Sequence, residues 1–292
     1  MPSPSVRPLW WWSIIWNRRL LGEEPDSFMT EWGIQKGRRR NEMDRSDFNL
    51  DLDEINRAFA GEDPRKLLAH VVEKIGPARI ALASSLSIED QVLTQMLLKI
   101  DARARIFFID TGRNFQQTYD LMEETMSRYE FHYEVYAPEN SELEPFLAEY
   151  GPNAFYDKVE LRQKCCELRK VRSLQRVLST VDGWICGLRK EQSPTRQEIG
   201  LLEWDSRHAI YKVNPLAAWS EEQVWAYIRR ENIPYSSLYN KGFRSIGCQP
   251  CTRAVAPGAD VRSGRWWWED PSKKECGLHP SLNPPAKEEE KR

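Results

Sequence analysis

The chain has 292 residues and a mass of 34.2 kDa, a length that predicts about two domains or one large domain with an appendage. Hydrophobic residues make up 40% and charged residues 29% of the chain, which excludes a disordered or fibrous protein. The net charge of -2 excludes a generally basic nucleic-acid binder, and six cysteines are too few for a disulfide-stapled scaffold of this length.

Residues 1–45 are expected to be a disordered extension, or to result from a start codon placed too far upstream. Their apolar run, residues 9–16, is far shorter than the ~20 residues of a membrane-spanning helix. Arg18 and Arg19 follow the run where a signal peptide would carry small residues. An amphipathic anchor at a membrane surface is the alternative. We therefore expect a cytoplasmic protein without membrane or nucleic-acid partners, whose cysteines are thiols or metal ligands.

From residue 50 onward, helix and strand patterns alternate. Helices are predicted where apolar residues recur at helical spacing, in residues 52–59, 67–75, 84–97, 115–128 and 220–228, and a further helix is predicted to carry Cys165 and Cys166. Strands are predicted at short apolar runs, in residues 79–84, 104–110, 133–136 and 183–187. This alternation predicts an α/β fold with a doubly wound, mainly parallel sheet and helices on both faces. The turn-rich residues 234–282 are expected to fold back over the sheet, and residues 283–292 to form a disordered tail.

Polar clusters follow three of the predicted strands, at residues 84–90, 110–113 and 188–196. Ligands of open α/β sheets bind at these carboxyl ends of strands. The serine-rich cluster 84–90 joins a strand to a helix, where backbone N–H groups and hydroxyls attract anions. It lacks the Gly-Lys-Ser/Thr of a Walker A loop, and a plain serine N-cap is the alternative interpretation.

Four cysteines form two tight pairs, Cys165-Cys166 and Cys248-Gln-Pro-Cys251. Four thiolates suit a zinc ion or an iron–sulfur cluster. Neighbouring side chains diverge, which favours a larger [4Fe–4S] cluster over a small tetrahedral ion, and four unrelated structural cysteines are the third alternative. Lys170 lies one helical turn beyond Cys166, where its charge would offset that of the thiolates unless it belongs to a solvated helix face.

The two remaining cysteines have different surroundings. Cys186 lies within the apolar strand 183–187 and is predicted to be a small buried hydrophobic residue. Cys276 lies in Glu-Cys-Gly-Leu-His, where His279 would tune its reactivity or shuttle a proton. An incidental surface thiol is the alternative for Cys276.

In combination, these motifs resemble the assimilatory adenylyl-sulfate (APS) reductases of the APS/PAPS reductase family, over roughly residues 48–280. The motifs that carry the resemblance are Cys-Cys-x-x-Arg-Lys, Gly-Leu-Arg-Lys-Glu-Gln-Ser-Pro-Thr-Arg, Gly-Cys-Gln-Pro-Cys-Thr-Arg, Gly-Arg-Trp-Trp-Trp-Glu and Glu-Cys-Gly-Leu-His. The cluster 84–90 also resembles the modified phosphate loop of the adenine-nucleotide alpha-hydrolases, without the glycines of its adenylating members. The resemblance implies a nucleotide-binding domain over residues 46–233 and a catalytic cysteine in 234–282.

The resemblance further implies that the Cys276 thiolate attacks the sulfur of adenosine 5′-phosphosulfate (APS) and that AMP leaves. Thioredoxin, or a glutaredoxin-like reductant, then releases sulfite from the S-sulfocysteine. The implied catalytic residues are Cys276, His279, Lys170, Arg262 and Arg265. The implied substrate-binding residues are Ser85, Ser87, Asp90, Asp110, Thr111 and Arg189. The implied cofactor is a [4Fe–4S] cluster on Cys165, Cys166, Cys248 and Cys251.

Three other functions fit part of the sequence. A reductase for 3′-phospho-APS (PAPS) would usually lack the cysteine pairs, whereas some family members that carry the cluster accept both substrates. An adenylyl-transferring ATP pyrophosphatase would need the missing glycines. A non-catalytic iron–sulfur redox sensor would not depend on Cys276. The family resemblance also suggests a homo-oligomer.

Overall fold

The computed structural model describes residues 48, 50–192 and 197–270. The predicted extension 1–45, the tail 283–292, Cys276 and His279 lie outside these residues. The described strands form a sheet in the order β3-β2-β1-β4-β6-β5, in which β5 alone is antiparallel to its neighbour. Their bounds are β1 Ile80–Ser84, β2 Arg105–Ile109, β3 Glu134–Tyr136, β4 Gly183–Ile185, β5 Leu202–Asp205 and β6 Ile210–Val213. The predicted mainly parallel α/β sheet is confirmed.

The helices of the described chain alternate with the first four strands. Their bounds are α3 Leu52–Ala58, α4 Pro64–Ile75, α5 Ile88–Ile100, α6 Gln116–Tyr129, α7 Asn140–Tyr150, α8 Val159–Cys166, α9 Arg172–Leu178 and α10 Glu221–Glu231. None of the helices in the described residues is long and apolar enough to cross a membrane. Strands β5 and β6 and helix α7 are absent from the sequence prediction, which otherwise places the elements within a few residues.

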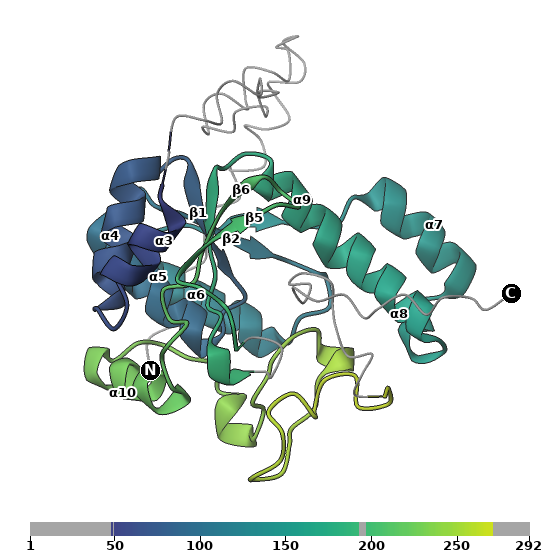
Figure 1. Cartoon of the computed structure of the whole chain (residues 1–292). Helices are drawn as coiled ribbons and strands as arrows, with labels where there is room; N and C mark the ends of the chain where they lie inside the picture. The colour runs from purple at the N-terminus through teal and green to yellow at the C-terminus, as the bar shows by residue number, and fades with distance from the viewer. Residues whose placement is uncertain (1–47, 49, 193–196, 271–292) are drawn as a thin grey trace, which may run out of the picture. The chain divides into compact units, whose positions relative to one another are not determined.

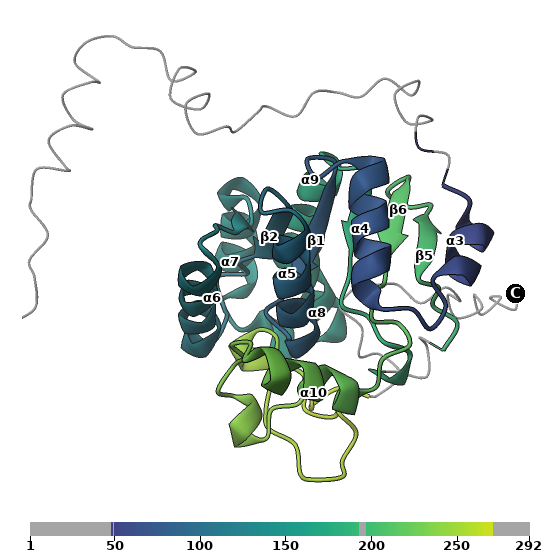
Figure 2. The ribbon, with the colours of Figure 1, turned by 90° about the vertical axis from the view of Figure 1, so that its left-hand side faces the viewer.

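Successive side chains along the strands pack alternately into two separate apolar layers, one on each face of the sheet. Leu82 and Ile106 point to one face, where α4, α5 and α10 bury their apolar stripes. Ala81, Phe107 and Trp184 point to the other face and pack against α9. This two-residue period is what a pleated strand with both faces covered requires. Figure 2 shows α4 and α5 on the near side of β1 and α9 on the far side. Helices therefore cover both faces, as predicted.

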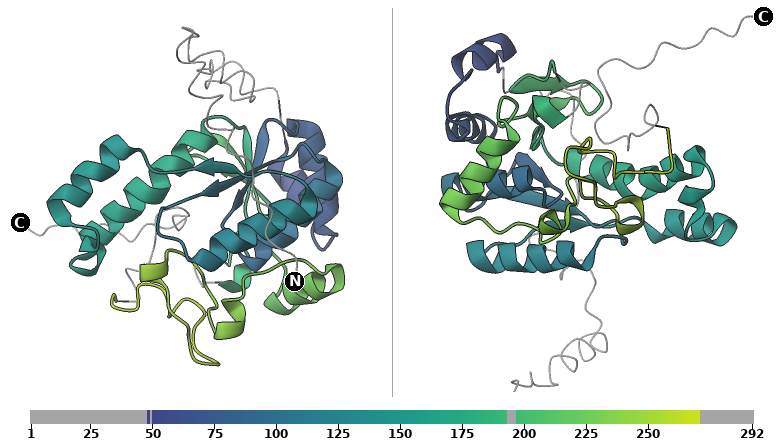
Figure 3. Two further views of the ribbon diagram at one scale, coloured as in Figure 1. Left: turned by 180° about the vertical axis from the view of Figure 1, so that it is seen from behind. Right: turned by 90° about the horizontal axis from the view of Figure 1, so that it is seen from below.

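Helices α8 and α9 are joined through a π-helical turn, Glu167–Val171, so that they form one interrupted rod (Figure 1). Phe146 of α7 packs against Leu168 of this turn, and Figure 3 shows α7 alongside the rod from behind. Single π turns inside α-helices are frequently found at functional sites. The turn begins immediately after Cys166, at the end of α8.

The irregular residues 234–270 lie across the carboxyl ends of the strands, as the yellow-green trace below the sheet in Figure 1 shows. Backbone hydrogen bonds hold this segment to itself, for example from Arg253 N to Gly264 O (3.0 Å). Another bond, from Gln249 N to Arg113 O (2.8 Å), ties it to the loop after β2. The segment therefore forms one wall of the space at the strand ends.

Candidate functional site

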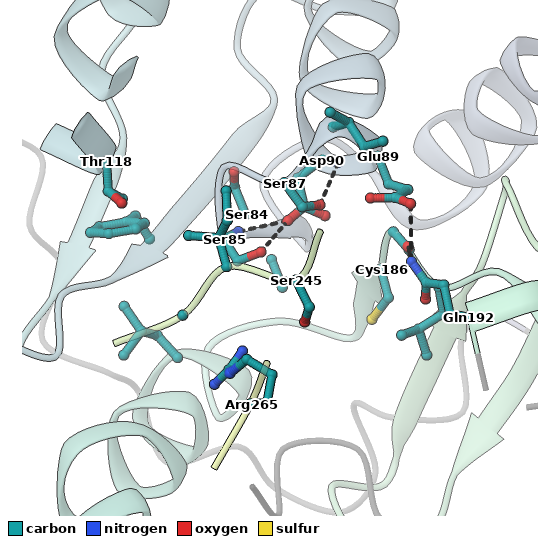
Figure 4. A pocket seen from close by; sticks show the side chains of 18 of the residues that line it. Ser84, Ser85, Ser87, Glu89, Asp90, Thr118, Cys186, Gln192, Ser245 and Arg265 are labelled. Atoms are coloured by element: carbon teal, nitrogen blue, oxygen red, sulfur yellow. Dashed lines mark hydrogen bonds between the residues drawn. The ribbon is translucent and has the colours of Figure 1, made fainter. Parts of the chain in front are cut away.

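A cavity of about 280 Å³ lies at the carboxyl ends of β1, β2 and β4 (Figure 4). Its walls come from the three polar clusters that the sequence places after strands, and from the C-terminal segment. We call it the strand-end pocket. The predicted residues that line it are Ser85, Ser87, Asp90, Thr111, Lys170, Arg189, Arg262 and Arg265. Its position agrees with the expected binding edge of an open α/β sheet.

The serine loop at the start of α5 is held by Asp90. Asp90 Oδ2 accepts hydrogen bonds from Ser85 N and Ser85 Oγ, both at 2.7 Å, and Ser87 Oγ accepts one from Asp90 N at 3.3 Å. Leu86, between the serines, has a left-handed backbone with φ 60°. Burial raises the pKa of Asp90 to about 6, against the opposing effect of the bonds from Ser85. The loop is thus bent around a carboxylate, and its hydroxyls line the pocket.

Arg265 brings a buried positive charge to the opposite wall. Its side chain lies across the pocket from Ser84 and Ser85 in Figure 4, and the residue is 7% exposed. Its Cζ lies 4.8 Å from the centroid of the Trp266 ring, and its Nε has no acceptor among the described residues. A Cβ at Gly247 would clash with this guanidinium, so a glycine there leaves room for it. Such a cation is suited to an anionic ligand.

Arg189 lines the pocket, but its charge is already paired. Its Nε donates to Glu89 Oε1 at 2.8 Å, and its Nη1 approaches Glu191 Oε2 at 3.3 Å. Glu89 also accepts from Gln192 Nε2 at 3.1 Å. Arg189 and Glu89 are both about 95% buried. The pair thus supports the wall formed after β4 instead of presenting an uncompensated cation.

Asp110 is placed outside the residues that line the pocket. Its Oδ1 accepts hydrogen bonds from Gly112 N (2.8 Å), Asn114 Nδ2 (3.2 Å) and Tyr119 OH (2.7 Å). These bonds tie the loop after β2 to the first turns of α6. Asp110 therefore shapes the loop that carries Thr111 to the pocket.

All four paired cysteines line a second, smaller cavity. Cys166, Cys248 and Cys251 form a buried apolar cluster with Phe155 and Trp266, and Cys165 packs against it. The described residues contain no group of three or more His, Cys, Asp and Glu side chains that could hold a metal ion. The structure thus brings the cysteine pairs together from α8 and from the turn at residues 249–251.

Lys170 lines both cavities, which makes it the link between them. Thr111 adds a second connection, because its Oγ1 is hydrogen-bonded to Cys248 Sγ at 3.3 Å and its carbonyl accepts from Arg169 Nη1 at 2.7 Å. Burial acts to raise the pKa of Cys248, but Lys170 and the Thr111 bond bring that pKa below its usual value. In contrast, burial and the neighbouring cysteines raise the pKa of Cys251 to about 12.

Some pocket residues are absent from the sequence prediction. Glu89 and Gln192 lie inside two of the predicted polar clusters, so their location could have been found by extending those clusters. Asn114 directly follows the cluster 110–113 and could have been found in the same way, whereas Thr118 and Ser245 have no comparable signal. Cys186 is 2% exposed and packs with Trp184 in the layer under α9, as expected for a small buried side chain, although it also borders the pocket.

Comparisons with known proteins show the family to which the chain belongs. A model of the family described as phosphoadenosine phosphosulfate reductase domain matches residues 79–254. Adenosine 5′-phosphosulfate reductase from Allochromatium vinosum is 46% identical over 214 residues, which cover 73% of this chain and 83% of that protein. The enzyme of the same name from Agrobacterium fabrum is 40% identical over 231 residues, 79% of this chain and 88% of that one. A crystal structure of phosphoadenylyl-sulfate (PAPS) reductase from Candida auris, in a phosphate complex, has a TM-score of 0.60 and 28% identity, covering 70% of this chain and 96% of that one. The chain therefore belongs to the phosphoadenosine phosphosulfate reductase domain family.

Proposed function

We propose that the protein reduces APS to sulfite and AMP in assimilatory sulfate reduction. The observation that carries this proposal is that Lys170 lines both the strand-end pocket and the cavity of the four cysteines. Relatives that are 40–46% identical and bear the name adenosine 5′-phosphosulfate reductase support the choice of substrate. The prediction of an oxidoreductase that acts on a sulfur group agrees with those names.

The pocket offers separate surroundings for the two ends of such a substrate. Ser85, Ser87 and Thr111 supply hydroxyls at the strand ends, where a nucleotide phosphate binds in open α/β folds. Lys170, Arg262 and Arg265 supply positive charge to the pocket, and Lys170 also lines the cavity of the four cysteines. A sulfonate repels an attacking thiolate, so fixed cations around it lower the barrier to attack. In this assignment Asp90, Asp110 and Arg189 hold the binding loops in place.

The proposed chemistry uses two thiol steps. The Cys276 thiolate attacks the substrate sulfur, a sulfur–sulfur bond forms, and the sulfur–oxygen bond to AMP breaks. A thiolate of a thioredoxin-like dithiol then attacks Cys276 Sγ and displaces sulfite. The second thiol of the reductant resolves the mixed disulfide, so that the dithiol is oxidised to a disulfide and Cys276 returns as a thiol. His279 is proposed to assist proton transfer at Cys276.

We also propose that Cys165, Cys166, Cys248 and Cys251 hold a [4Fe–4S] cluster. The surroundings fit an electron-rich group, because Arg169 Nε and Trp266 Nε1 are buried N–H donors without an acceptor among the described residues. Lys170 would add positive charge on the pocket side. When bound, the cluster would supply negative charge and a covalent link between α8 and the C-terminal segment. An iron assay and a visible absorption spectrum of anaerobically purified protein distinguish it from zinc, which is colourless.

PAPS is the second candidate substrate. The matching family is described by that substrate, and the Candida auris structure bears its name. The two cysteine pairs favour APS. Competition between APS and PAPS in a sulfite-release assay decides between them, and equal use of both would establish dual specificity.

The proposal further includes a cytoplasmic location, where thiols stay reduced, a thioredoxin-like partner and a homo-oligomer.

The proposed reaction is tested by Cys276→Ser. The variant should release no sulfite and retain the visible chromophore, because it lacks the nucleophile but keeps the four cluster ligands. The control is Cys251→Ser, which should lose the chromophore. Sulfite release from APS at the wild-type rate by Cys276→Ser would contradict the proposal.

A further inference from the structure

A buried ion pair joins helix α8 to the C-terminal segment. Arg162 Nε donates to Glu269 Oε1 at 2.9 Å, and Arg162 Nη2 donates to Glu269 Oε2 at 2.7 Å. The two side chains are 1% and 2% exposed. Arg162 belongs to the helix that ends in Cys165 and Cys166, and Glu269 follows the tryptophan run. The pair thus connects two elements that both border the candidate site.

The same arginine contacts the ring next to the pocket cation. Arg162 Cζ lies 4.7 Å from the centroid of the Trp266 ring, and Arg265 Cζ lies 4.8 Å from the same centroid. Trp266 is 1% exposed, and Glu269 N donates to Trp266 O at 2.9 Å. Contacts therefore run without a gap from Glu269 through Arg162 and Trp266 to Arg265, which lines the pocket.

Arg265 has no carboxylate partner among the described residues that would fix its guanidinium. Its position depends on the Trp266 ring and on the space above Gly247. A buried ion pair adds little net stability over an apolar pair of similar size, because desolvation offsets the attraction, whereas its bidentate geometry specifies one arrangement. The Arg162–Glu269 pair is therefore better explained by the arrangement that it imposes than by the stability that it adds.

We propose that Arg162 and Glu269 are positioning residues, which hold Trp266 and through it place Arg265 for the anionic end of the substrate. The identity of that substrate rests on the proposed function. The positioning itself applies to any anionic nucleotide in the pocket, so binding of AMP tests it independently of sulfite release.

The test replaces the pair by apolar residues in Arg162→Met/Glu269→Leu, which removes both charges of the pair together and also removes the interaction of Arg162 with Cys166. The variant should fold with an unchanged melting temperature, bind AMP at least tenfold more weakly and show a KM for APS raised by at least tenfold, while kcat changes less. The matched control is Arg105→Met/Glu134→Leu, which removes another bidentate pair, between β2 and β3, away from the pocket. That control should leave the KM and the AMP affinity unchanged.

A second variant, Arg162→Lys, keeps the charge but loses the planar fork. It should weaken AMP binding several-fold, and it carries the test if the double variant does not fold. The positioning role is wrong if the folded double variant binds AMP with wild-type affinity and has the wild-type KM. If only Arg162→Lys folds, the same result in that variant overturns the role. If wild-type protein binds AMP but releases no sulfite from APS, the proposed reaction fails while the AMP comparison still decides the role of the pair.

Discussion

Several charged residues of the site act on other protein groups. Asp90 binds the Ser85 backbone and hydroxyl, Asp110 binds its own loop, and Arg189 pairs with Glu89. Their positions in the sequence predicted that they lie at the carboxyl ends of the strands, because polar clusters after parallel strands converge at one edge of the sheet. Their individual partners could not be predicted, since those depend on loop geometry that the order of residue types does not specify. Arg265 differs, because its buried guanidinium borders the pocket without a carboxylate partner among the described residues.

At the residue scale, Asp90 should make stability depend on pH. Its pKa of about 6 in the folded protein lies above the 3.8 of an ordinary aspartate, chiefly through burial. Its favourable contribution is therefore complete below about pH 3.8 and is lost as pH rises through about 6, a change of about 3 kcal/mol. The free energy of unfolding of wild type relative to Asp90→Asn should fall by about this amount over that range.

Urea unfolding of both proteins at several pH values between about 4 and 7 measures this difference. Asp101→Asn is the control, because the hydrogen bond from Arg103 lowers the pKa of Asp101, so its contribution is lost only below about pH 3.8 and its difference from wild type should change little over this range. A difference between wild type and Asp90→Asn that stays constant with pH would show that Asp90 has no raised pKa.

At the element scale, long periodic segments are predicted well and short ones are not. Helix α5, with its serine N-cap and continuous buried stripe, lies where the sequence places it. Strands β5 and β6 have four residues each; β5 carries two acidic residues at the edge of the sheet, and the short apolar run of β6 is interrupted by Lys212. Helix α7 buries one described residue, Phe146, and contains Pro145. Where burial is slight, sequence periodicity carries too little signal.

Two serine N-caps with the same local chemistry allow the effect of a serine on helix stability to be distinguished from its effect on ligand binding. Ser87 Oγ accepts from Asp90 N at 3.3 Å, and Ser220 Oγ accepts from Gln223 N at 3.1 Å. Each Ser→Ala variant should lose about 1 kcal/mol of stability. AMP affinity should fall only in Ser87→Ala, because Ser87 lines the pocket and Ser220 does not. Equal AMP affinities in the two variants, measured by calorimetry, would refute a ligand-binding role for Ser87.

At the scale of the described molecule, the cysteine cluster is separate from the sheet. The two apolar layers of the sheet contain none of the paired cysteines, which pack instead with Phe155 and Trp266. This division is consistent with the sequence, because the predicted strands contain none of the paired cysteines, which lie in a predicted helix and in the turn-rich residues 234–282. The sequence could not predict the π turn after Cys166, which depends on how α8 and α9 pack.

This separation predicts that losing the proposed cluster loosens one part of the molecule. In Cys248→Ser/Cys251→Ser, the ligands from the C-terminal segment are lost, while β1, β2 and β4 keep both packed faces. Hydrogen exchange should therefore accelerate in residues 154–166 and 246–270 and stay slow in these strands. The control Cys186→Ser makes the same sulfur-to-oxygen change inside the sheet layer, where exchange should instead accelerate around β4. Uniformly faster exchange across the sheet in the double variant would mean that the cysteines and the sheet unfold as one cooperative unit.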